Sequence, residues 1–495
     1  MPASPFARKP IRVLLDELRS EQRLRRVLGR AQLTALGVGA IIGTGIFVLT
    51  GQAAHDKAGP ALMLSFVVAG LGCVFAALCY AELAAMVPVA GSAYTYAYAT
   101  LGQLPAWIIG WDLVLEYAVG AATVAHGWSH YLQDFLRIAG IEVPRAMATA
   151  PFDYDPAVGR IVSTGAIVDL PAVLIVIAVM AVLVKGIRES AAVNSAIVLL
   201  KVAIVVFVIG LGSRHVDPAN WRPFAPYGYG GIALFGKTLW GETGKGGEPL
   251  GMLAGAATIF FAYIGFDSVS THAEEAKAPQ RDVPIAIVAS LAVCTVLYVA
   301  MAAVLTGMVR YDRLAIDAPV SHAFAQVGLP WAQVVVSLGA VAGITSVLLV
   351  FMLSQARILL AMARDGLLPP GFFGAVHPRY HTPYKSTLLT GVFVATLAGL
   401  LPLRILAELV NIGTLLAFVI VCAAVLVLRR THPDAERPFR APWFPVTPLL
   451  GIAICLLLMF SLPAENWLRL AVWLALGLVV YFGYGRRRAG SWPGV

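Results

Sequence analysis

Apolar runs of about twenty residues recur along this sequence, separated by short polar segments. Each run is long enough to cross ~30 Å of hydrocarbon as a helix. Because the bilayer core offers no water to the backbone, a spanning run has to satisfy its own hydrogen bonds, as a helix does. The sequence therefore predicts an all-α polytopic membrane protein with about 12 transmembrane helices. The spans lie near residues 32–50, 61–86, 104–131, 168–185, 192–212, 251–272, 284–307, 331–356, 385–401, 404–428, 444–461 and 467–485.

Glycine interrupts two of these spans at corresponding positions. The first span contains Gly37, Gly39, Gly43 and Gly45, and the sixth contains Gly265. Interrupted spans at matching positions of two halves indicate a transporter's binding site near the bilayer midplane, and this spacing predicts a five-plus-five inverted repeat. The predicted organisation is a cytoplasmic basic amphipathic segment (1–31), a first repeat of helices 1–5 (32–212), an external loop (213–250), a second repeat of helices 6–10 (251–428), and helices 11–12 with a cytoplasmic C-terminus (429–495).

Charge patterning sets the expected orientation. Charged residues make up only 13% of the chain, and the formal net charge is +9. When the spans are threaded with the N-terminus inside, Lys and Arg concentrate in the cytoplasmic segments, as the positive-inside rule requires. The basic excess therefore predicts a multi-pass protein of the cell inner (cytoplasmic) membrane with both termini cytoplasmic, and no nucleic-acid partner.

Two charged segments are expected on the cytoplasmic side. Met1–Arg30 lacks the apolar core and cleavage site of a signal peptide and favours an amphipathic helix on the inner leaflet. A charged loop after the sixth span is predicted either to close an inner gate with this basic N-terminus or to be a solvated loop. Its charged residues are Glu274, Glu275, Lys277, Arg281 and Asp282.

An interrupted helix leaves backbone N–H and C=O groups without helical partners. The helix that starts near Gly45 offers N–H groups and a positive dipole end, which suit a carboxylate. Carbonyls at the end of the preceding half-helix, and those between Phe261 and Ile264, suit an ammonium group. A carboxylate beside an ammonium is the constant part of an α-amino acid. The alternative is that the glycines only permit close helix packing.

At this level of detail the sequence resembles the amino acid–polyamine–organocation superfamily, and within it bacterial members of the cationic amino acid transporter family. The resemblance covers nearly the whole chain and is carried by the stretches 39–47, 91–96, 110–117, 261–267, 273–282 and 364–369. It implies an inverted-repeat fold, alternating access and amino acid transport. It also implies that Thr44, Gly45, Phe261, Ala262 and Ile264 line the site, with Phe261 as a gate near the substrate.

Lys201 lies in the middle of the fifth span. Its Cα is about ten residues, or ~15 Å, from either interface, too deep to reach water easily. A charged lysine at the bilayer centre costs roughly 2.5–3.5 kcal/mol on insertion scales, and burial favours the neutral amine. The sequence thus predicts a proton-coupling residue. The alternative is a permanently charged lysine held by carbonyls of the broken first helix.

The resemblance bears on the choice of coupling ion. It implies proton coupling, because proton-coupled relatives have a lysine in the fifth span where sodium-coupled folds bind an ion. Thr345 and Ser346 point the other way, since such a hydroxyl pair accompanies sodium in related folds. We predict a proton gradient as the energy source and no cofactor.

The side chains expected around the breaks are mainly apolar, which bears on the substrate. Gly43, Thr44, Gly45 and Ala262 are joined there by Ile42, Ile46, Phe261, Ile264 and Ile344, with Glu116 as the only obvious counter-charge. Small or medium neutral amino acids are therefore favoured over cationic ones. Glu116 either tunes substrate or proton binding or is a structural partner of a neighbouring polar group.

Several classes of protein lack support in this sequence. No nucleophile–base set, metal-ligand cluster or phosphate-binding loop is visible, so an enzyme or an ATP-driven pump is not predicted. His126 and His130 are spaced like metal ligands, but we found no acids associated with the histidines and predict core or interface positions. A proton-coupled amino acid symporter remains. The alternatives are an amino acid exchanger, a cationic amino acid transporter without proton coupling, and, in a different class, a channel or receptor. The expected partners are the amino acid and the lipid bilayer, with a small membrane subunit or a homo-oligomer left open.

Overall fold

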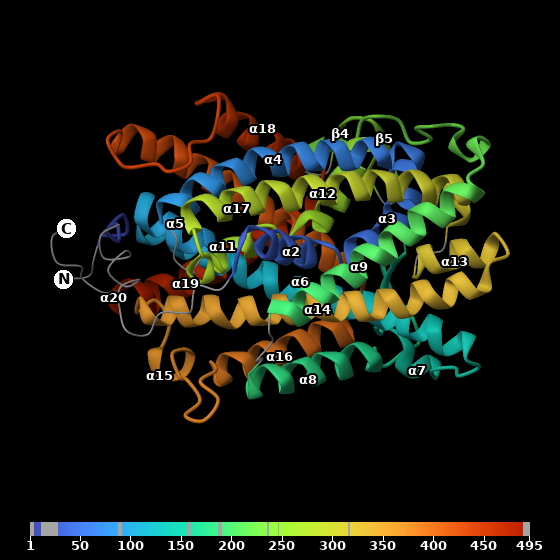
Figure 1. Cartoon of the computed structure of the whole chain (residues 1–495), viewed down its shortest axis with the longest axis horizontal. Helices are drawn as coiled ribbons and strands as arrows, with labels where there is room; N and C mark the ends of the chain where they lie inside the picture. Colours follow the sequence, from blue (N-terminus) through green and yellow to red (C-terminus); the bar gives the residue numbers. More distant parts are fainter. Residues whose placement is uncertain are drawn as a thin grey trace.

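The computed structural model describes residues 4–10, 28–87, 92–155, 160–186, 191–234, 237–245, 247–314 and 317–488. Its long helices run side by side along one axis, as an elongated bundle (Figure 1). The helices α5, α15 and α20 lie at one end of the bundle, here called the α20 side. The helices α7 and α13 lie at the other end, here called the loop side.

Every predicted span is helical, which confirms an all-α polytopic fold. The spans are α2 (Arg30–Ile41) with η1 (Gly45–Leu49), α3 (Thr50–Ala53) and η2 (Ala54–Ala58); α4 (Leu62–Met86); α6 (Gln103–Ile138); α8 (Leu170–Lys185); α9 (Ala191–Gly212); α10 (Met252–Ile259) with η6 (Phe260–Tyr263) and α11 (Ser268–Thr271); α12 (Pro279–Met308); α14 (Pro330–Arg364); α16 (Tyr384–Leu400); α17 (Leu403–Thr431); α18 (Val446–Phe460); and α19 (Ala464–Val480) with η9 (Tyr481–Gly485) and α20 (Arg486–Arg488). Among the described residues, eight helical segments are long and apolar enough to cross a membrane, and three shorter apolar helices accompany them.

The connections contain short elements. These are η3 (Gly59–Ala61), α5 (Ser92–Thr100), α7 (Arg145–Ala148), η4 (Ser213–His215), η5 (Pro218–Trp221), η7 (Ala273–Glu275), η8 (Tyr311–Arg313), α13 (Pro319–Gln326) and α15 (Pro370–Phe373). Three antiparallel hairpins pair β1 (Phe152–Asp155) with β2 (Arg160–Ser163), β3 (Ile232–Leu234) with β4 (Lys237–Trp240), and β5 (Glu242–Thr243) with β6 (Pro249–Leu250).

Several helices extend beyond their predicted apolar limits. The third runs to residue 138 rather than 131, and the eighth runs to Arg364 rather than residue 356. The seventh begins at Pro279, where proline suits the first turn, rather than at residue 284. Hydropathy detects only the part of a helix inside the hydrocarbon, so polar turns beyond it are missed.

Both predicted helix breaks are present. The helix α2 ends at Ile41, Ile42 is extended with ψ of 105°, and helical structure resumes at Gly45. In the sixth span, α10 passes into the 3₁₀ turn η6, after which Ile264 is extended with ψ of 135°. Gly265 then has φ of +117°, a conformation that favours glycine. The chain therefore departs from helix twice within the bundle.

On the α20 side, the start of the first span is fastened to the segment after the sixth. Leu28 N–H donates to the Glu275 carbonyl and Lys277 N–H donates to the Leu28 carbonyl, each at 2.9 Å. Arg30 lies 3.4 Å from the Asp282 carboxylate. These contacts join the two segments predicted to form an inner gate. Residues 11–27, most of the predicted amphipathic segment, and the Glu274 side chain lie outside the described part of the structure.

Candidate functional site

The two helix breaks lie directly against each other. A Cβ atom added to Gly45 would overlap the main chain of Ala262, so glycine is needed for this approach. A Cβ atom added to Gly265 would lie 2.8 Å from the carbonyl oxygen of Ala40. The glycines therefore permit close packing, as the alternative interpretation held, and they do so where the two breaks meet.

Tyr298 of α12 connects the two breaks. Its hydroxyl lies 2.9 Å from the carbonyl oxygen of Ile41 and 2.8 Å from that of Ala262. A hydroxyl has one proton to donate, so the two carbonyls share a single donor. The Tyr298 side chain is fully buried. It supplies part of the hydrogen bonding that the two interrupted helices lack.

Three consecutive backbone donors remain at the first break. Within the described part of the chain, the N–H groups of Gly43, Thr44 and Gly45 donate to no carbonyl or side chain. Helical structure runs from Gly45 to Ala58, so these groups stand at the positive end of a helix. This arrangement suits a carboxylate.

Acceptors remain at the sixth break. The carbonyl oxygens of Tyr263 and Ile264 accept no hydrogen bond from any described residue, whereas the neighbouring Ala262 carbonyl is occupied by Tyr298. Carbonyl oxygens at a helix break suit an ammonium group. The two breaks thus present donors on one segment and acceptors on the other, which is the pattern expected for the two charged groups of an α-amino acid.

The predicted side chains around the breaks are apolar and buried. Exposed fractions are 0% for Ile42, Ile46 and Ile344, 1% for Ala262, 2% for Ile264 and 4% for Phe261. These side chains therefore have almost no contact with solvent, and they place aliphatic and aromatic groups around the breaks.

Helices α6 and α14 cover the first break. The Thr44 hydroxyl lies 3.4 Å from the carbonyl oxygen of Val124 on α6. A Cβ atom at Gly43 would lie 2.9 Å from the Val347 side chain on α14. Ile344, one turn earlier on α14, lies on the same stretch of helix. The structure thus brings the predicted first-span residues and Ile344 to one place.

Lys201 of α9 also reaches the first break. Its ammonium nitrogen lies 2.6 Å from the carbonyl oxygen of Gly39 and 3.2 Å from that of Ile42, and the side chain is 1% exposed. Both carbonyls belong to the C-terminal end of α2, where the helix dipole attracts a cation. The burial of Lys201 agrees with its predicted place in the middle of the fifth span. Its partners are carbonyls of the broken first helix, as the alternative of a structural lysine predicted.

The hydroxyl pair on α14 has protein partners. The Trp128 indole donates to the Thr345 hydroxyl at 2.9 Å, and Thr345 donates to the Val341 carbonyl at 2.7 Å. Ser346 donates to the Gly343 carbonyl at 3.1 Å. Gly343 also faces Lys201, because a Cβ atom added to this glycine would lie 3.2 Å from the lysine Cγ atom. The pair therefore lies close to the lysine rather than in a separate site.

Glu116 lies one helical turn from the apolar lining. It is 1% exposed on α6, four residues before Gly120, which packs near Phe261. Its neighbours include Asp267, Asp112 and the Thr414 hydroxyl, rather than the residues of the first break. Glu116 is thus close enough to influence the site and is separated from the three N–H groups.

Sequence reasoning missed the acids that accompany the histidines, and the statement that none are associated with them is wrong. His126 Nδ1 lies 2.8 Å from Asp169, which also accepts from Ser129 at 2.6 Å. His55 Nδ1 lies 2.6 Å from Asp56. Asp56 is adjacent in sequence and was detectable, whereas Asp169 caps a different helix. Among described residues, no group of three or more His, Cys, Asp or Glu side chains could hold a metal ion.

Comparison with known proteins decides the family. The profile of the amino acid permease family matches residues 28–480, which include both breaks and the last helical span. The chain belongs to the amino acid permease family. The predicted membership of the wider superfamily is therefore confirmed, and the permease is a transporter rather than an enzyme.

Proteins similar to this chain are named for the transport of different substrates. The permease is 46% identical to a branched-chain amino acid permease of Bacillus subtilis (strain 168) over 490 residues, 99% of each chain. It is 44% identical to a methylthioribose transporter of the same organism over 487 residues, 98% of this chain and 99% of that protein. It is 40% identical to a vacuolar cationic amino acid transporter of Arabidopsis thaliana over 414 residues, 83% of this chain and 64% of that protein.

Proposed function

We propose that this permease moves neutral aliphatic amino acids across the cytoplasmic membrane by proton-coupled symport. The observation that carries the proposal is the pairing of the two breaks, with backbone donors at Gly43–Gly45 opposite backbone acceptors at Tyr263 and Ile264. The donors bind the substrate carboxylate and the acceptors bind its ammonium group. Because these are main-chain groups, they recognise what all α-amino acids share.

The side-chain preference follows from the lining. Ile42, Phe261, Ile264 and Ile344 surround the breaks with apolar surface. A neutral aliphatic side chain gains roughly 25 cal/mol for each Å² of apolar surface buried there, whereas an unpaired cationic one is costly to desolvate. Glu116, one turn away, is the residue through which a cationic side chain would be accepted. The similarity to a branched-chain amino acid permease supports the neutral choice.

Proton coupling is assigned to Lys201. When protonated, its ammonium group is attracted by the carbonyl end of α2 and holds the Gly39 and Ile42 carbonyls. Loss of the proton removes the charge and weakens this attraction, so the first helix is held less firmly. Substrate at the first break and a proton on Lys201 would thus stabilise the same arrangement of α2, which is the linkage that symport requires.

Alternating access is assigned to the two halves of the chain. Residues 32–212 and 251–428 act as inverted repeats that rock around the paired breaks, with the α20 side facing the cytoplasm. The two-span segment 429–495 stays outside this pair. Burial of the side chains around the breaks supports the assignment of this structure to an occluded intermediate of such a cycle.

The test measures radiolabelled leucine uptake into proteoliposomes, with and without an imposed inside-alkaline gradient. Lys201→Ala should reduce gradient-driven uptake at least about 30-fold, because the proposed proton carrier is removed and two buried carbonyls lose their donor at about 1–3 kcal/mol each. Lys185→Ala, which removes an exposed lysine at the end of α8, should behave like wild type.

Exchange of preloaded leucine for external leucine separates coupling from binding. Lys201→Ala should retain more exchange than net uptake, because exchange needs no net proton movement. Equal loss of both activities would leave Lys201 as a structural tie and favour an exchanger without proton coupling. Uptake that follows a sodium gradient would overturn the choice of ion, and transport of no amino acid would overturn the substrate class.

A further inference from the structure

A charged cavity lies on the loop side, away from the helix breaks. It has a volume of about 180 Å³ and is bordered by the segment before β6 and by the starts of α17 and α19. One water molecule needs roughly 10–15 Å³ of such space, so the cavity accepts a ligand of many atoms. Its charged residues are Glu248, Arg404, Glu408, Glu465 and Arg469.

Two of the three carboxylates in this cavity are paired with arginine. Arg404 Nε lies 3.3 Å from Glu408, and Arg469 Nη2 lies 3.3 Å from Glu465. Glu248 differs: its side chain is 8% exposed, and its Oε2 atom has no hydrogen-bond partner among the described residues. A buried carboxylate oxygen without a partner is costly unless a ligand satisfies it. The three carboxylates and two arginines of the cavity have a formal net charge of −1.

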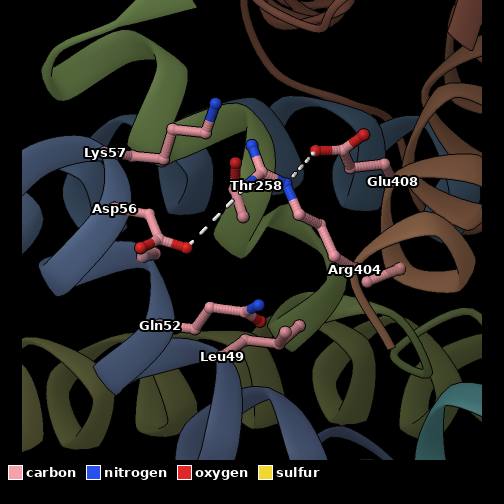
Figure 2. Close-up of a pocket in the computed structure, with 9 residues that line it drawn as sticks. Leu49, Gln52, Asp56, Lys57, Thr258, Arg404 and Glu408 are labelled. Atoms are coloured by element: carbon pink, nitrogen blue, oxygen red, sulfur yellow. Dashed lines mark hydrogen bonds and ion pairs between the residues drawn. The ribbon is translucent and has the colours of Figure 1, made fainter. Parts of the chain in front are cut away.

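Arg404 and Glu408 separate this cavity from a smaller pocket nearer the first break. That pocket has a volume of only about 10 Å³, and its lining includes Leu49, Asp56 and Lys57. Figure 2 shows Asp56 and Lys57 across the pocket from Arg404 and Glu408. Arg404 Nη1 lies 3.9 Å from Asp56, so the arginine spans from α17 to the first helix. Leu49 lies four residues along that helix from Gly45.

We propose that the loop-side cavity is a second binding site, which holds a zwitterionic amino acid before it reaches the helix breaks; this rests on the proposed function. The ligand's ammonium group pairs with Glu248. Its carboxylate pairs with Arg469, which now donates to Asn466 Oδ1 at 2.8 Å and whose charged partner Glu465 is 64% exposed and therefore weakly bound. A ligand with both charges satisfies Glu248 and Arg469 together, whereas a simple anion would leave the Glu248 Oε2 atom without a hydrogen bond.

The site also explains the position of Arg404. It borders both the cavity and the small pocket, so a carboxylate entering the cavity competes with Glu408 and Asp56 for its guanidinium group. Such competition weakens the contacts of Arg404 with Glu408 and Asp56 only when a ligand is present. The second site thus links arrival of an amino acid to opening of the path toward the first break.

The experiment is equilibrium binding of radiolabelled L-leucine to the purified full chain, with the number of leucines per chain as the readout. Wild type should bind two, with different affinities. Glu248→Gln keeps the size of the side chain and removes its charge, so it should weaken the second leucine roughly 10-fold or more, as expected for loss of a charge-assisted hydrogen bond. Arg469→Gln tests the same site from α19 and should also weaken the second leucine.

The matched control is Glu242→Gln, which removes the same charge from an exposed position on the same loop, outside the cavity. It should bind leucine like wild type. One leucine per chain in wild type, or two of unchanged affinity in Glu248→Gln, would overturn the second site while leaving the central site intact. No leucine bound by wild type would overturn the proposed function and this site with it.

Discussion

The two helix breaks differ in how their backbone is satisfied. The first is held by side chains from distant helices, since Lys201 and Tyr298 bind the carbonyls of Gly39, Ile41 and Ile42. The sixth is closed mostly by its own segment. Ser268 Oγ donates to the Gly265 carbonyl at 2.6 Å.

Further bonds of the sixth break are local as well. Ser270 Oγ donates to the Asp267 carbonyl at 2.5 Å, and Ile264 N–H donates to the Phe261 carbonyl at 3.1 Å. Bonds within one segment move with it, whereas bonds to α9 and α12 break when the helices shift. The first break is therefore the part of the site whose shape depends on the state of the whole bundle.

Of the substitutions at the two breaks, Gly45→Ala should have the largest effect on leucine uptake. The added methyl group would overlap the Ala262 main chain, and overpacking against a backbone costs about 1–3 kcal/mol or more. We expect leucine uptake to fall more than about 100-fold and thermal stability to fall as well, because the breaks must separate. Gly210→Ala on α9 is the control, since no atom lies within 4 Å of its Cβ position. Unchanged uptake in Gly45→Ala would show that the breaks need not touch.

Tyr298→Phe should have an intermediate effect. It removes the donor shared by the Ile41 and Ala262 carbonyls, at a cost of about 1–3 kcal/mol, and should lower uptake roughly 10-fold. Tyr481→Phe is the matched control, because its buried hydroxyl also donates a hydrogen bond, to Gln103 Oε1 at 2.9 Å, but belongs to the last helical span rather than to either break. Equal losses in the two variants would mean that burial of a hydroxyl, rather than the bridge, accounts for the effect.

Ser268→Ala should have the smallest effect. It removes one hydrogen bond worth about 0.5–1.5 kcal/mol, but the Gly265 carbonyl keeps the Ser268 N–H at 3.1 Å. Uptake should stay within about 3-fold of wild type, and the apparent melting temperature should change little. A loss as large as that of Tyr298→Phe would contradict the view that the Gly265 carbonyl keeps enough hydrogen bonding from its own segment without the Ser268 hydroxyl.

The sequence predicted the features that depend on local pattern. Helical spans follow from runs of apolar residues, and both breaks follow from glycines such as Gly45 and Gly265. The deep position of Lys201 follows from its place in a span, and its binding to carbonyls of the broken first helix was one of the two alternatives, although the sequence did not single out Gly39 and Ile42. The roles assigned to Lys201 and to the lining residues remain predictions for the uptake experiments to test.

Features that depend on pairing between distant positions were not predicted. Tyr298 resembles any tyrosine in an apolar helix until α12 is placed against both breaks. Asp169 and His126 lie on different helices, and Arg404 approaches Asp56 only because the fold brings the start of α17 near the end of the first span. A single sequence gives the hydrophobic periodicity of each helix, but it gives little information about which helix faces pack against each other.

The strand-like pairing between Leu28 and the segment Glu275–Lys277 offers a way to measure opening of the α20 side over time. Its two amide protons are held between the chain before the first span and the chain after the sixth, which would separate in the proposed cycle when the α20 side opens. Their exchange with deuterium from solvent should therefore be slow while that side is closed and fast while it is open. These two positions record, without an attached probe, how often the permease visits its open state, and mass spectrometry reads them from one peptide on each side.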